Sequence, residues 1–569
     1  MRTILNAIRE YYRNHSTLCN FALLFCWMIV NLIQAAFTGL ANDEAYYWMY
    51  SRNMDYGYFD HPPAIALLIK AGYAVFQSEL GVRWLIVLME TLFIWGVFLL
   101  TNRRNFPLFF VIVCSVSCLQ VYGFIAVPDA PLLFFTTVFF LLYKRWSEND
   151  GVVNSLLLGL TIAALLYCKY HGLLVLFFTL LSNLSVLKNK RFYLLISISV
   201  IAYLPHILWQ ITNDYPSYQY HVLTKSQDPY KPVDTLVFVA GQLMIAGPLT
   251  GLLLFYTAFR YRVQSVTEKA LKYTFTGFIV FFLFSTLNAP VEANWTVAAF
   301  VPMIVLSYNY MTLRPTLKKW MIRLSLVSCL FFMFLRVNLI FDLVPAVGSK
   351  LLPEFYDWKT WARQIQAEAG EKPVVFANSY QKASKYSFYS GQTSLSLNNI
   401  QYRRNQYDIW NIEESLQGKR IIYIPNWEIA GEGVHSLWTM KGKIQYIFID
   451  NFRSYSKINI TTPEPRYVFK AGMLVHFPVT LINNYGNPVT FGKNKTYPDW
   501  LVFCLFREEE SVGEEKKLAL DGLTIDDSLN VRTLFQVPER TGTYYLRISI
   551  KNGWLPPGIN SRLIRLRVE

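Results

Sequence analysis

Residues 17–48 read TLCNFALLFCWMIVNLIQAAFTGLANDEAYYW. The part from Thr17 to Leu40 is apolar and reaches the length of about 20 residues that a helix needs to cross a bilayer. Asp43 and Glu44 follow at once. Because a carboxylate is costly to remove from water, two acids beside an apolar helix favour a functional site at the boundary between lipid and water. An acidic helix cap followed by a belt of interfacial aromatic residues is the structural alternative.

The rest of the chain repeats this apolar pattern. Of its 569 residues 53% are hydrophobic, and the mean hydropathy of +0.26 excludes an ordinary soluble enzyme. We therefore expect an α-helical polytopic membrane protein with about eleven transmembrane helices. The expected spans are residues 17–40, 83–100, 106–126, 130–143, 153–168, 172–187, 192–211, 235–258, 274–288, 295–311 and 320–343.

The distribution of charge predicts the orientation. Lysine and arginine are concentrated in alternate connecting segments, such as 188–191 and 314–323, whereas the other segments hold acids. Because basic segments are retained in the cytoplasm, we expect the acidic segments and the region after the last span to lie outside a bacterial inner membrane. The short apolar stretch 64–76 is interrupted by Lys70, so we expect it to lie in the membrane interface or to re-enter the membrane. We attribute the net charge of +15 mainly to the basic segments that set the orientation in the membrane. No basic cluster on a soluble face indicates binding of nucleic acid.

We expect three domains: a transmembrane domain at 1–343, a small external α/β domain at 344–454 and a β-sandwich at 455–569. Strand patterns at 373–377, 420–424 and 445–449, with a helical stretch at 358–369, indicate the α/β domain. Strands separated by turns at 472–481, 500–506, 542–550 and 562–568 indicate the sandwich. Only Cys504 lies in this external part, and no CxxC pair suggests a metal site, although a divalent cation stays possible as a cofactor.

Ionisable side chains stand at the ends of several expected spans, where they suggest function. The first group holds Asp43, Glu44, Asp60 and His61, where one carboxylate could take a proton from an acceptor hydroxyl. The second is Asp129, which is bracketed by prolines. A simple helix cap is the alternative for Asp129.

Two further groups could bind substrate. Lys169, Tyr170 and His171 form a natural site for an anion such as phosphate, and the alternative is a lysine that snorkels beside an interfacial tyrosine. The segment 288–295 combines an acid, amides and a tryptophan that could hold a sugar by hydrogen bonds and stacking. In the external region, the segment 403–410 could bind substrate or form an aromatic-packed surface.

Taken in order, these segments resemble a known family. The motifs are DEAYYW at 43–48, GYFDHPP at 57–63, GVR at 81–83, PDAP at 128–131, KYHG at 169–172, EANW at 292–295 and RNQYDIW at 404–410. They are similar to the bacterial branch of the GT-C glycosyltransferases, the protein O-mannosyltransferase-like family that includes the lipid A aminoarabinose transferases. The resemblance covers about residues 15–415. It implies an enzyme that moves a sugar, with inversion, from a polyprenyl-phosphate carrier to an acceptor on the outer face of the membrane.

The resemblance also suggests roles for individual residues. Asp43 maps to the base that activates the acceptor, and Glu44 and Asp129 complete the expected catalytic set. Charge on the leaving phosphate would be stabilised by Arg83, Lys169, His171 and His61. The expected substrate-binding residues are Tyr46, Tyr58, Asp60, Tyr170, Glu292, Asn294, Trp295, Asn405 and Tyr407. The acceptor could be lipid A, another envelope glycan or a protein hydroxyl, and membrane lipid surrounds the site.

Two other functions fit some of these features. A transporter or flippase of polyprenyl-linked sugars would also need many spans and a basic external site. It should show ionisable residues near the bilayer midplane or repeated halves; Glu90 and Arg336 lie inside expected spans, but no repeat is evident. A membrane-anchored receptor that binds glycans through its β module would not need eleven spans. Both stay open as alternatives to the glycosyltransferase.

Overall fold

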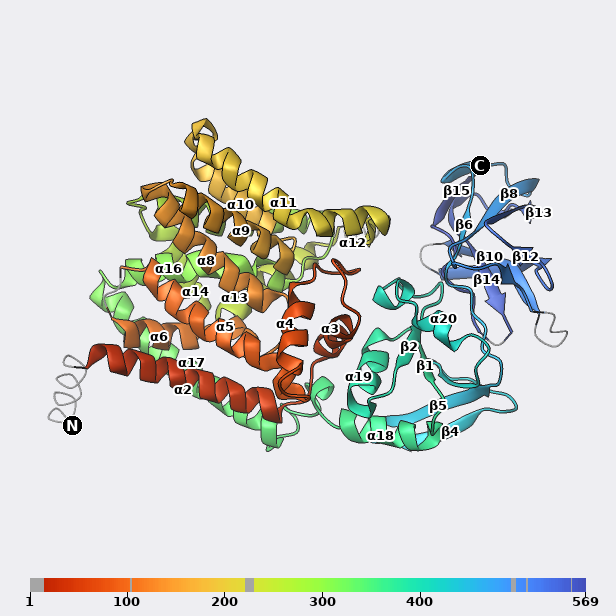
Figure 1. Cartoon of the computed structure of the whole chain (residues 1–569), viewed down its shortest axis with the longest axis horizontal. Helices are drawn as coiled ribbons and strands as arrows, with labels where there is room; N and C mark the ends of the chain where they lie inside the picture. The colour runs from red at the N-terminus through yellow and green to blue at the C-terminus, as the bar shows by residue number, and fades with distance from the viewer. Residues whose placement is uncertain (1–14, 103–104, 221–229, 493–497, 508–509, 554) are drawn as a thin grey trace. The chain divides into compact units, whose positions relative to one another are not determined.

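The computed structural model describes residues 15–102, 105–220, 230–492, 498–507, 510–553 and 555–569. The chain forms two compact units, Met1–Tyr356 and Asp357–Glu569. The first is helical and runs from red to green in Figure 1, and the second is rich in strands and runs from teal to blue. This confirms the expected change from a helical N-terminal region to a strand-rich C-terminal region.

The described part of the first unit consists of helices joined by short connections. They are α2 (Ser16–Phe37), α3 (Asn42–Arg52), α4 (Ala64–Tyr73), α5 (Glu79–Leu100), α6 (Phe106–Cys114), α7 (Ser117–Tyr122), α8 (Asp129–Glu148), α9 (Val152–Cys168), α10 (Gly172–Ser182), η1 (Leu184–Lys188), α11 (Lys190–Thr212), α12 (Pro216–Tyr218), α13 (Pro232–Ala246), α14 (Gly251–Arg260), α15 (Val266–Ser285), η4 (Ala293–Ala299), α16 (Phe300–Met311), α17 (Pro315–Phe341) and η5 (Pro353–Phe355).

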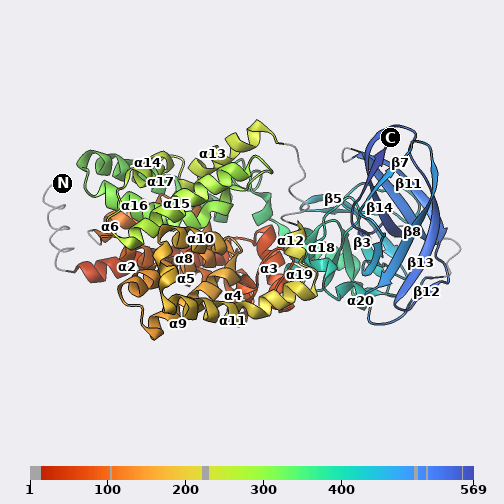
Figure 2. The same ribbon diagram turned by 90° about the horizontal axis from the view of Figure 1, so that it is seen from above.

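Among the described residues, four helices are long and apolar enough to cross a membrane: α2, α5, α11 and α17. The pair α13 and α14 passes the same test as one broken span, and its two helices, green in Figure 2, meet at 95°. These helices make the chain a multi-pass membrane protein. Each expected tract falls on one helix or on two consecutive ones.

Two of the expected spans, 106–126 and 235–258, are each divided between two α-helices, which corrects the prediction of one continuous span. The first divides into α6 and α7, and the second bends between α13 and α14. Gly247 there has a φ of +131°, and Pro248 offers no N–H, so a regular helix cannot continue. The two breaks lie together, because Ser115 Oγ is 3.4 Å from Thr250 Oγ1 and accepts a hydrogen bond of 3.1 Å from Ser325.

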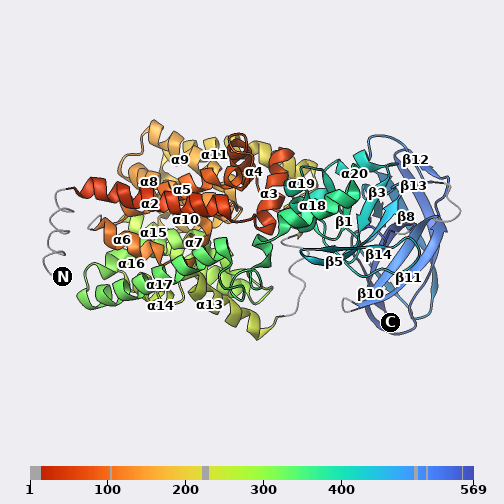
Figure 3. The ribbon, with the colours of Figure 1, turned by 90° about the horizontal axis from the view of Figure 1, so that it is seen from below.

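The second unit begins with a mixed sheet whose strand order is β2-β1-β3-β5-β4. β1 is parallel to β2 and β3, whereas β5 is antiparallel to β3 and β4. Figure 3 shows α18 and α19 beside β1. The elements are α18 (Trp358–Ala369), β1 (Val374–Ala377), α19 (Tyr380–Ser390), β2 (Ser394–Leu397), η6 (Gln406–Asp408), α20 (Ile412–Leu416), β3 (Ile421–Ile424), β4 (His435–Thr439) and β5 (Gly442–Ile449).

Three sheets follow, with strand orders β11-β10-β14-β15-β7, β13-β8-β6 and β12-β9. Leu481 and Phe535 from the three-stranded sheet share one buried core with Phe503 and Ile548 from the five-stranded sheet. The strands are β6 (Ile458–Thr461), β7 (Arg466–Phe469), β8 (Leu474–Asn483), β9 (Val489–Thr490), β10 (Asp499–Arg507), β11 (Glu510–Ala519), β12 (Thr524–Ile525), β13 (Ser528–Gln536), β14 (Gly542–Asn552) and β15 (Ile564–Val568).

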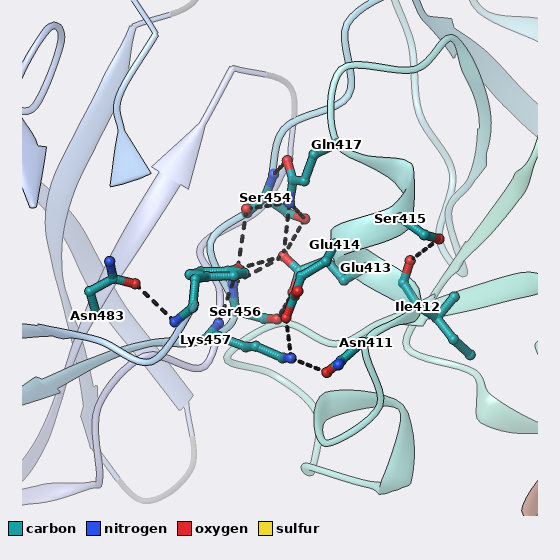
Figure 4. A network of polar contacts seen from close by, with 11 residues as sticks. Asn411, Ile412, Glu413, Glu414, Ser415, Gln417, Ser454, Ser456, Lys457 and Asn483 are labelled. Carbon is teal, nitrogen blue, oxygen red and sulfur yellow. Dashed lines mark hydrogen bonds and ion pairs between the residues drawn. The ribbon is translucent and has the colours of Figure 1, made fainter. Parts of the chain in front are cut away.

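A polar network joins these sheets to the preceding α/β part (Figure 4). The buried carboxylate of Glu413 accepts hydrogen bonds from the hydroxyls of Ser454, Ser456 and Tyr485. Lys457 pairs with Glu414 beside it. Because a buried carboxylate is stable only when its oxygens are hydrogen-bonded, this network favours one fixed arrangement of the two parts of the second unit.

Candidate functional site

The start of α3 is fixed by a buried ion pair between Glu44 and Arg83. Arg83 Nε donates to Glu44 Oε1 at 2.7 Å and Nη2 donates to Oε2 at 2.5 Å, and neither side chain is exposed. The remaining N–H groups of Arg83 donate to the carbonyls of Ala35, Thr38 and Gly39. All five N–H groups of the guanidinium are therefore used within the protein.

Both carboxylate oxygens of Glu44 also accept hydrogen bonds from the backbone. Its Oε2 accepts the N–H of Ala41 at 2.8 Å, and its Oε1 accepts the N–H of Ala126, also at 2.8 Å. The first bond caps α3, and the second ties α3 to the segment that leads to Asp129. Asp43, next in the chain to this buried carboxylate, is exposed in the first turn of α3.

Asp60 lies against the same helix. Its Oδ2 is 3.3 Å from the hydroxyl of Tyr46 and 3.4 Å from that of Tyr50. The ring of Tyr58 stacks on Tyr50 with centroids 4.0 Å apart, and burial raises the pKa of the Tyr58 hydroxyl. His61 turns its ring toward Tyr47, at 5.6 Å between centroids. These aromatic side chains hold the 57–61 segment on α3.

The turn between α9 and α10 meets three other segments. Lys169 Nζ lies 2.7 Å from Asp129 Oδ1 in an ion pair that is almost completely buried. Asn294 Nδ2 lies 3.4 Å from the other oxygen of Asp129. The ring of His171 is 5.6 Å from that of Trp295. One turn thus gathers the candidates around 129 and around 292–295, although Glu292 itself is exposed at the start of η4.

Tyr170 connects this turn to the 57–61 segment. Its hydroxyl lies 3.0 Å from His206 Nε2 and from Ser217 Oγ, and it accepts a hydrogen bond of 2.7 Å from Gln210. Ser217 in turn donates to the carbonyl of Phe59 at 2.8 Å. Burial raises the pKa of the Tyr170 hydroxyl.

Gly57 explains why this loop can lie so close to α11. A Cβ at position 57 would stand 2.4 Å from the indole of Trp209 and 2.8 Å from His206 Nδ1. His206 Nδ1 also lies 2.8 Å from the carbonyl of Tyr56, and Trp209 Nε1 donates to Asp55 at 2.8 Å. Only glycine leaves room for these contacts.

The predicted segments of the first unit therefore form a closed set of contacts. Glu44 reaches Ala126, Asp129 reaches Lys169, and Tyr170 reaches back through Ser217 to the segment that carries Asp60. Four segments that are far apart in the sequence converge at one place.

Two predicted residues lie in the second unit and are used in its own packing. Asn405 is buried and its side chain accepts the N–H of Tyr407 at 3.0 Å to cap η6. The hydroxyl of Tyr407 lies 3.0 Å from Ser384 Oγ, and burial raises its pKa. No group of three or more His, Cys, Asp or Glu side chains that could hold a metal ion occurs within the described ranges.

Comparison with known proteins gives a family match over part of the chain and one shared fold. A profile described as dolichyl-phosphate-mannose-protein mannosyltransferase matches residues 60–209. Lipid A galacturonosyltransferase RgtD of Rhizobium johnstonii is 24% identical over 299 residues, which are 49% of this chain and 62% of that protein. The apo crystal structure of ArnT from Cupriavidus metallidurans matches with a TM-score of 0.55 at 12% identity, over 76% of this chain and 98% of ArnT.

The chain has the GT-C fold of ArnT. A second ArnT structure, bound to undecaprenyl phosphate, matches with a TM-score of 0.51 at 11% identity, over 75% of this chain and 97% of ArnT. The chain spans less than two thirds of the length of the galacturonosyltransferase that it matches.

The contacts of the site also include residues that the sequence patterns did not predict. Tyr50 follows Tyr46 by four residues, a spacing that places both on one face of α3 and could have revealed it. His206 and Gln210 have the same spacing near the end of an apolar helix, where buried polar residues suggest function. Ser217 carried no signal, because only the fold brings it to Tyr170 and Phe59.

Proposed function

We propose that this chain is a membrane glycosyltransferase that moves a sugar from a polyprenyl-phosphate carrier to an envelope acceptor. The convergence of the segments around Asp43, Asp60, Asp129 and Lys169 carries this proposal, because it gathers carboxylates and a cation at the ends of apolar helices. The GT-C fold and the match to a mannosyltransferase profile support it.

Asp43 is the proposed base. It is exposed, whereas Glu44, Asp60 and Asp129 are buried. The buried clamp of Glu44 and Arg83 fixes the first turn of α3 and so positions the Asp43 backbone. We accordingly assign Glu44 and Arg83 to positioning, since Arg83 has no N–H left for a phosphate.

Lys169, His171 and His61 remain the proposed partners of the donor phosphate. Asp129 occupies one of the three N–H groups of Lys169 and thereby orients the ammonium. An ammonium held in this way stabilises the negative charge that develops on the leaving phosphate without reorganising during the reaction.

The proposed reaction is a direct displacement. The acceptor hydroxyl attacks the anomeric carbon, the bond from that carbon to the phosphate oxygen breaks, and polyprenyl phosphate leaves with the electron pair. The hydroxyl proton passes to the carboxylate of Asp43. One base and one displacement invert the configuration at the anomeric carbon, unlike the two-step route of retaining enzymes.

The proposal also includes the number of spans, the side of the membrane on which the second unit lies and the β-sandwich. Eleven spans would place the chain after α17 outside the cytoplasm of a bacterial cell, and the core shared by two sheets supports a β-sandwich at 455–569. Lipid A is the first acceptor to test, because the curated relative is a lipid A galacturonosyltransferase. Other envelope glycans and protein hydroxyls follow as acceptors.

The test is transfer by the full chain reconstituted in vesicles, with a radiolabelled polyprenyl-phosphate sugar and lipid A, envelope glycan or protein as acceptor. A labelled acceptor with inverted anomeric configuration supports the proposal. Retention of configuration contradicts the displacement, and movement of the donor across the vesicle membrane without any transfer favours a flippase.

A further inference from the structure

The hairpin of β4 and β5 exposes large apolar side chains at its turn. Trp438 is 74% exposed and Met440 is 56% exposed, although both are costly to leave in water. Trp438 pairs across the hairpin with Lys443, which is also exposed, and Lys441 stands in the turn between the strands. A tryptophan and a methionine flanked by lysines are the composition of a surface that meets anionic lipid head groups.

The turn is held on α18. The N–H of Met440 donates to Gln364 at 2.9 Å, and Lys441 Nζ lies 5.0 Å from the centre of the Trp358 ring. Trp358 is the first residue of α18. The exposed turn is therefore fixed beside the point where the second unit begins.

In the sequence, the second unit begins soon after the end of an apolar helix. Tyr356, two residues before Trp358, donates its hydroxyl to the carbonyl of Asn338 at 3.2 Å. Asn338 lies less than one turn from Phe341, the last residue of the apolar helix α17. Two residues of chain span at most about 7 Å. The helix α18, which holds the turn, thus begins 17 residues after the end of α17, which is long and apolar enough to cross the bilayer.

The connecting segment points to the same surroundings. Leu343, two residues after the end of α17, is 64% exposed, and Leu351, ten residues after it, is 63% exposed. Exposed leucines at the end of a bilayer-spanning helix lie where the lipid head groups meet the acyl chains.

We propose that the turn of the β4–β5 hairpin is a bilayer anchor. Trp438 and Met440 enter the head-group region of the membrane that α17 crosses, and Lys441 and Lys443 contact lipid phosphates. The anchor would limit the motion of the second unit over the membrane surface.

The test uses the full chain in nanodiscs of phosphatidylethanolamine and phosphatidylglycerol that contain a lipid with a diazirine near its head group. After irradiation, labelled peptides are quantified by mass spectrometry. We expect the peptide with residues 435–443 to carry at least about fivefold more label than the peptide with Val468, a comparably exposed residue of β7. The double variant Trp438→Ser/Met440→Ser should fall to the Val468 level while the label on α17 stays unchanged.

Hairpin labelling no higher than that of the Val468 peptide, with α17 strongly labelled, would overturn the proposal. Equal labelling of the wild type and the double variant would do so as well. A cross-link from the hairpin to a second copy of the chain, in place of lipid, would show that the surface binds protein. None of these readouts depends on sugar transfer, so this inference and the proposed function fail separately.

Discussion

Glu44 and Arg83 are both fully buried and share two hydrogen bonds, of 2.7 Å and 2.5 Å. Around this pair, five backbone groups find their partners: the carbonyls of 35, 38 and 39 and the amides of 41 and 126. The pair therefore connects the end of α2, the start of α3, α5 and the segment before α8. It holds the first turn of α3, which carries Asp43, in one position.

Arg83→Lys should destabilise the first unit. A lysine has three N–H donors on one nitrogen, so it cannot reproduce the planar set of five that Arg83 uses. Each buried acceptor left without its donor costs about 1–3 kcal/mol, and the apparent melting temperature in detergent should fall clearly. Arg52→Lys, at the exposed end of α3, is the matched control and should leave it unchanged. Equal melting of both variants would refute the structural role of Arg83.

Lys169→Met should cost more stability than the double variant Asp129→Leu/Lys169→Met. The single change leaves the carboxylate of Asp129 buried without its cation, whereas the double change removes both charges. Thermal unfolding of the two variants in the same detergent measures the difference. A double variant less stable than the single variant would show that the unpaired charge of Asp129 does not cause the loss of stability. Transfer activity should be lost in both, because each removes the ammonium proposed to meet the phosphate.

Gly57→Ala should disturb the segment that carries Asp60. The added methyl group would overlap Trp209 and His206, and the loop would have to move away from α11. We expect transfer to fall by about tenfold or more, as small displacements near a reacting centre do. Gly486→Ala is the control, because nothing lies within 4 Å of its Cβ. Wild-type transfer by Gly57→Ala would show that the close approach is dispensable.

The second unit should lose stability as the pH rises from about 4 to about 6. Burial raises the pKa of Asp408 to about 6, whereas an aspartate in an unfolded chain titrates near 4. Between these values the folded unit retains a proton that the unfolded chain has lost, so the free energy of unfolding falls with increasing pH. Denaturant titrations of the wild type and Asp408→Asn across this range check the effect. The variant should show a shallower slope, and identical slopes would rule Asp408 out as the cause.

Much of the helical unit could be predicted because hydrophobic length alone specifies it. The apolar tract that starts at 17 became α2, and 358–369 became α18 with the same bounds. Strands such as β1 and β14 were recognisable from short apolar runs between turns. The break at Gly247 was not recognised, because a glycine followed by proline inside an apolar run was counted as part of one span.

The individual contacts of the site could not be predicted. Asp129 and Lys169 were both candidates, but separate roles were expected for them, because no local pattern shows that residues 40 positions apart form an ion pair. Arg83 was expected at the phosphate because the sequence shows its positive charge. The sequence does not show that this charge is paired with Glu44. Pairing across the fold is a tertiary property, and it decides whether a charge is available to a substrate.

Transfer by Asp43→Asn tests the central claim most directly. Wild type and variant are reconstituted at equal amounts with a labelled polyprenyl-phosphate sugar and a crude envelope acceptor, after equal melting temperatures have shown that both are folded. Removal of a general base costs about 10²–10⁴-fold in rate, so the variant should lose transfer while it still binds the donor. Equal transfer by both proteins would contradict the role of Asp43 as the base.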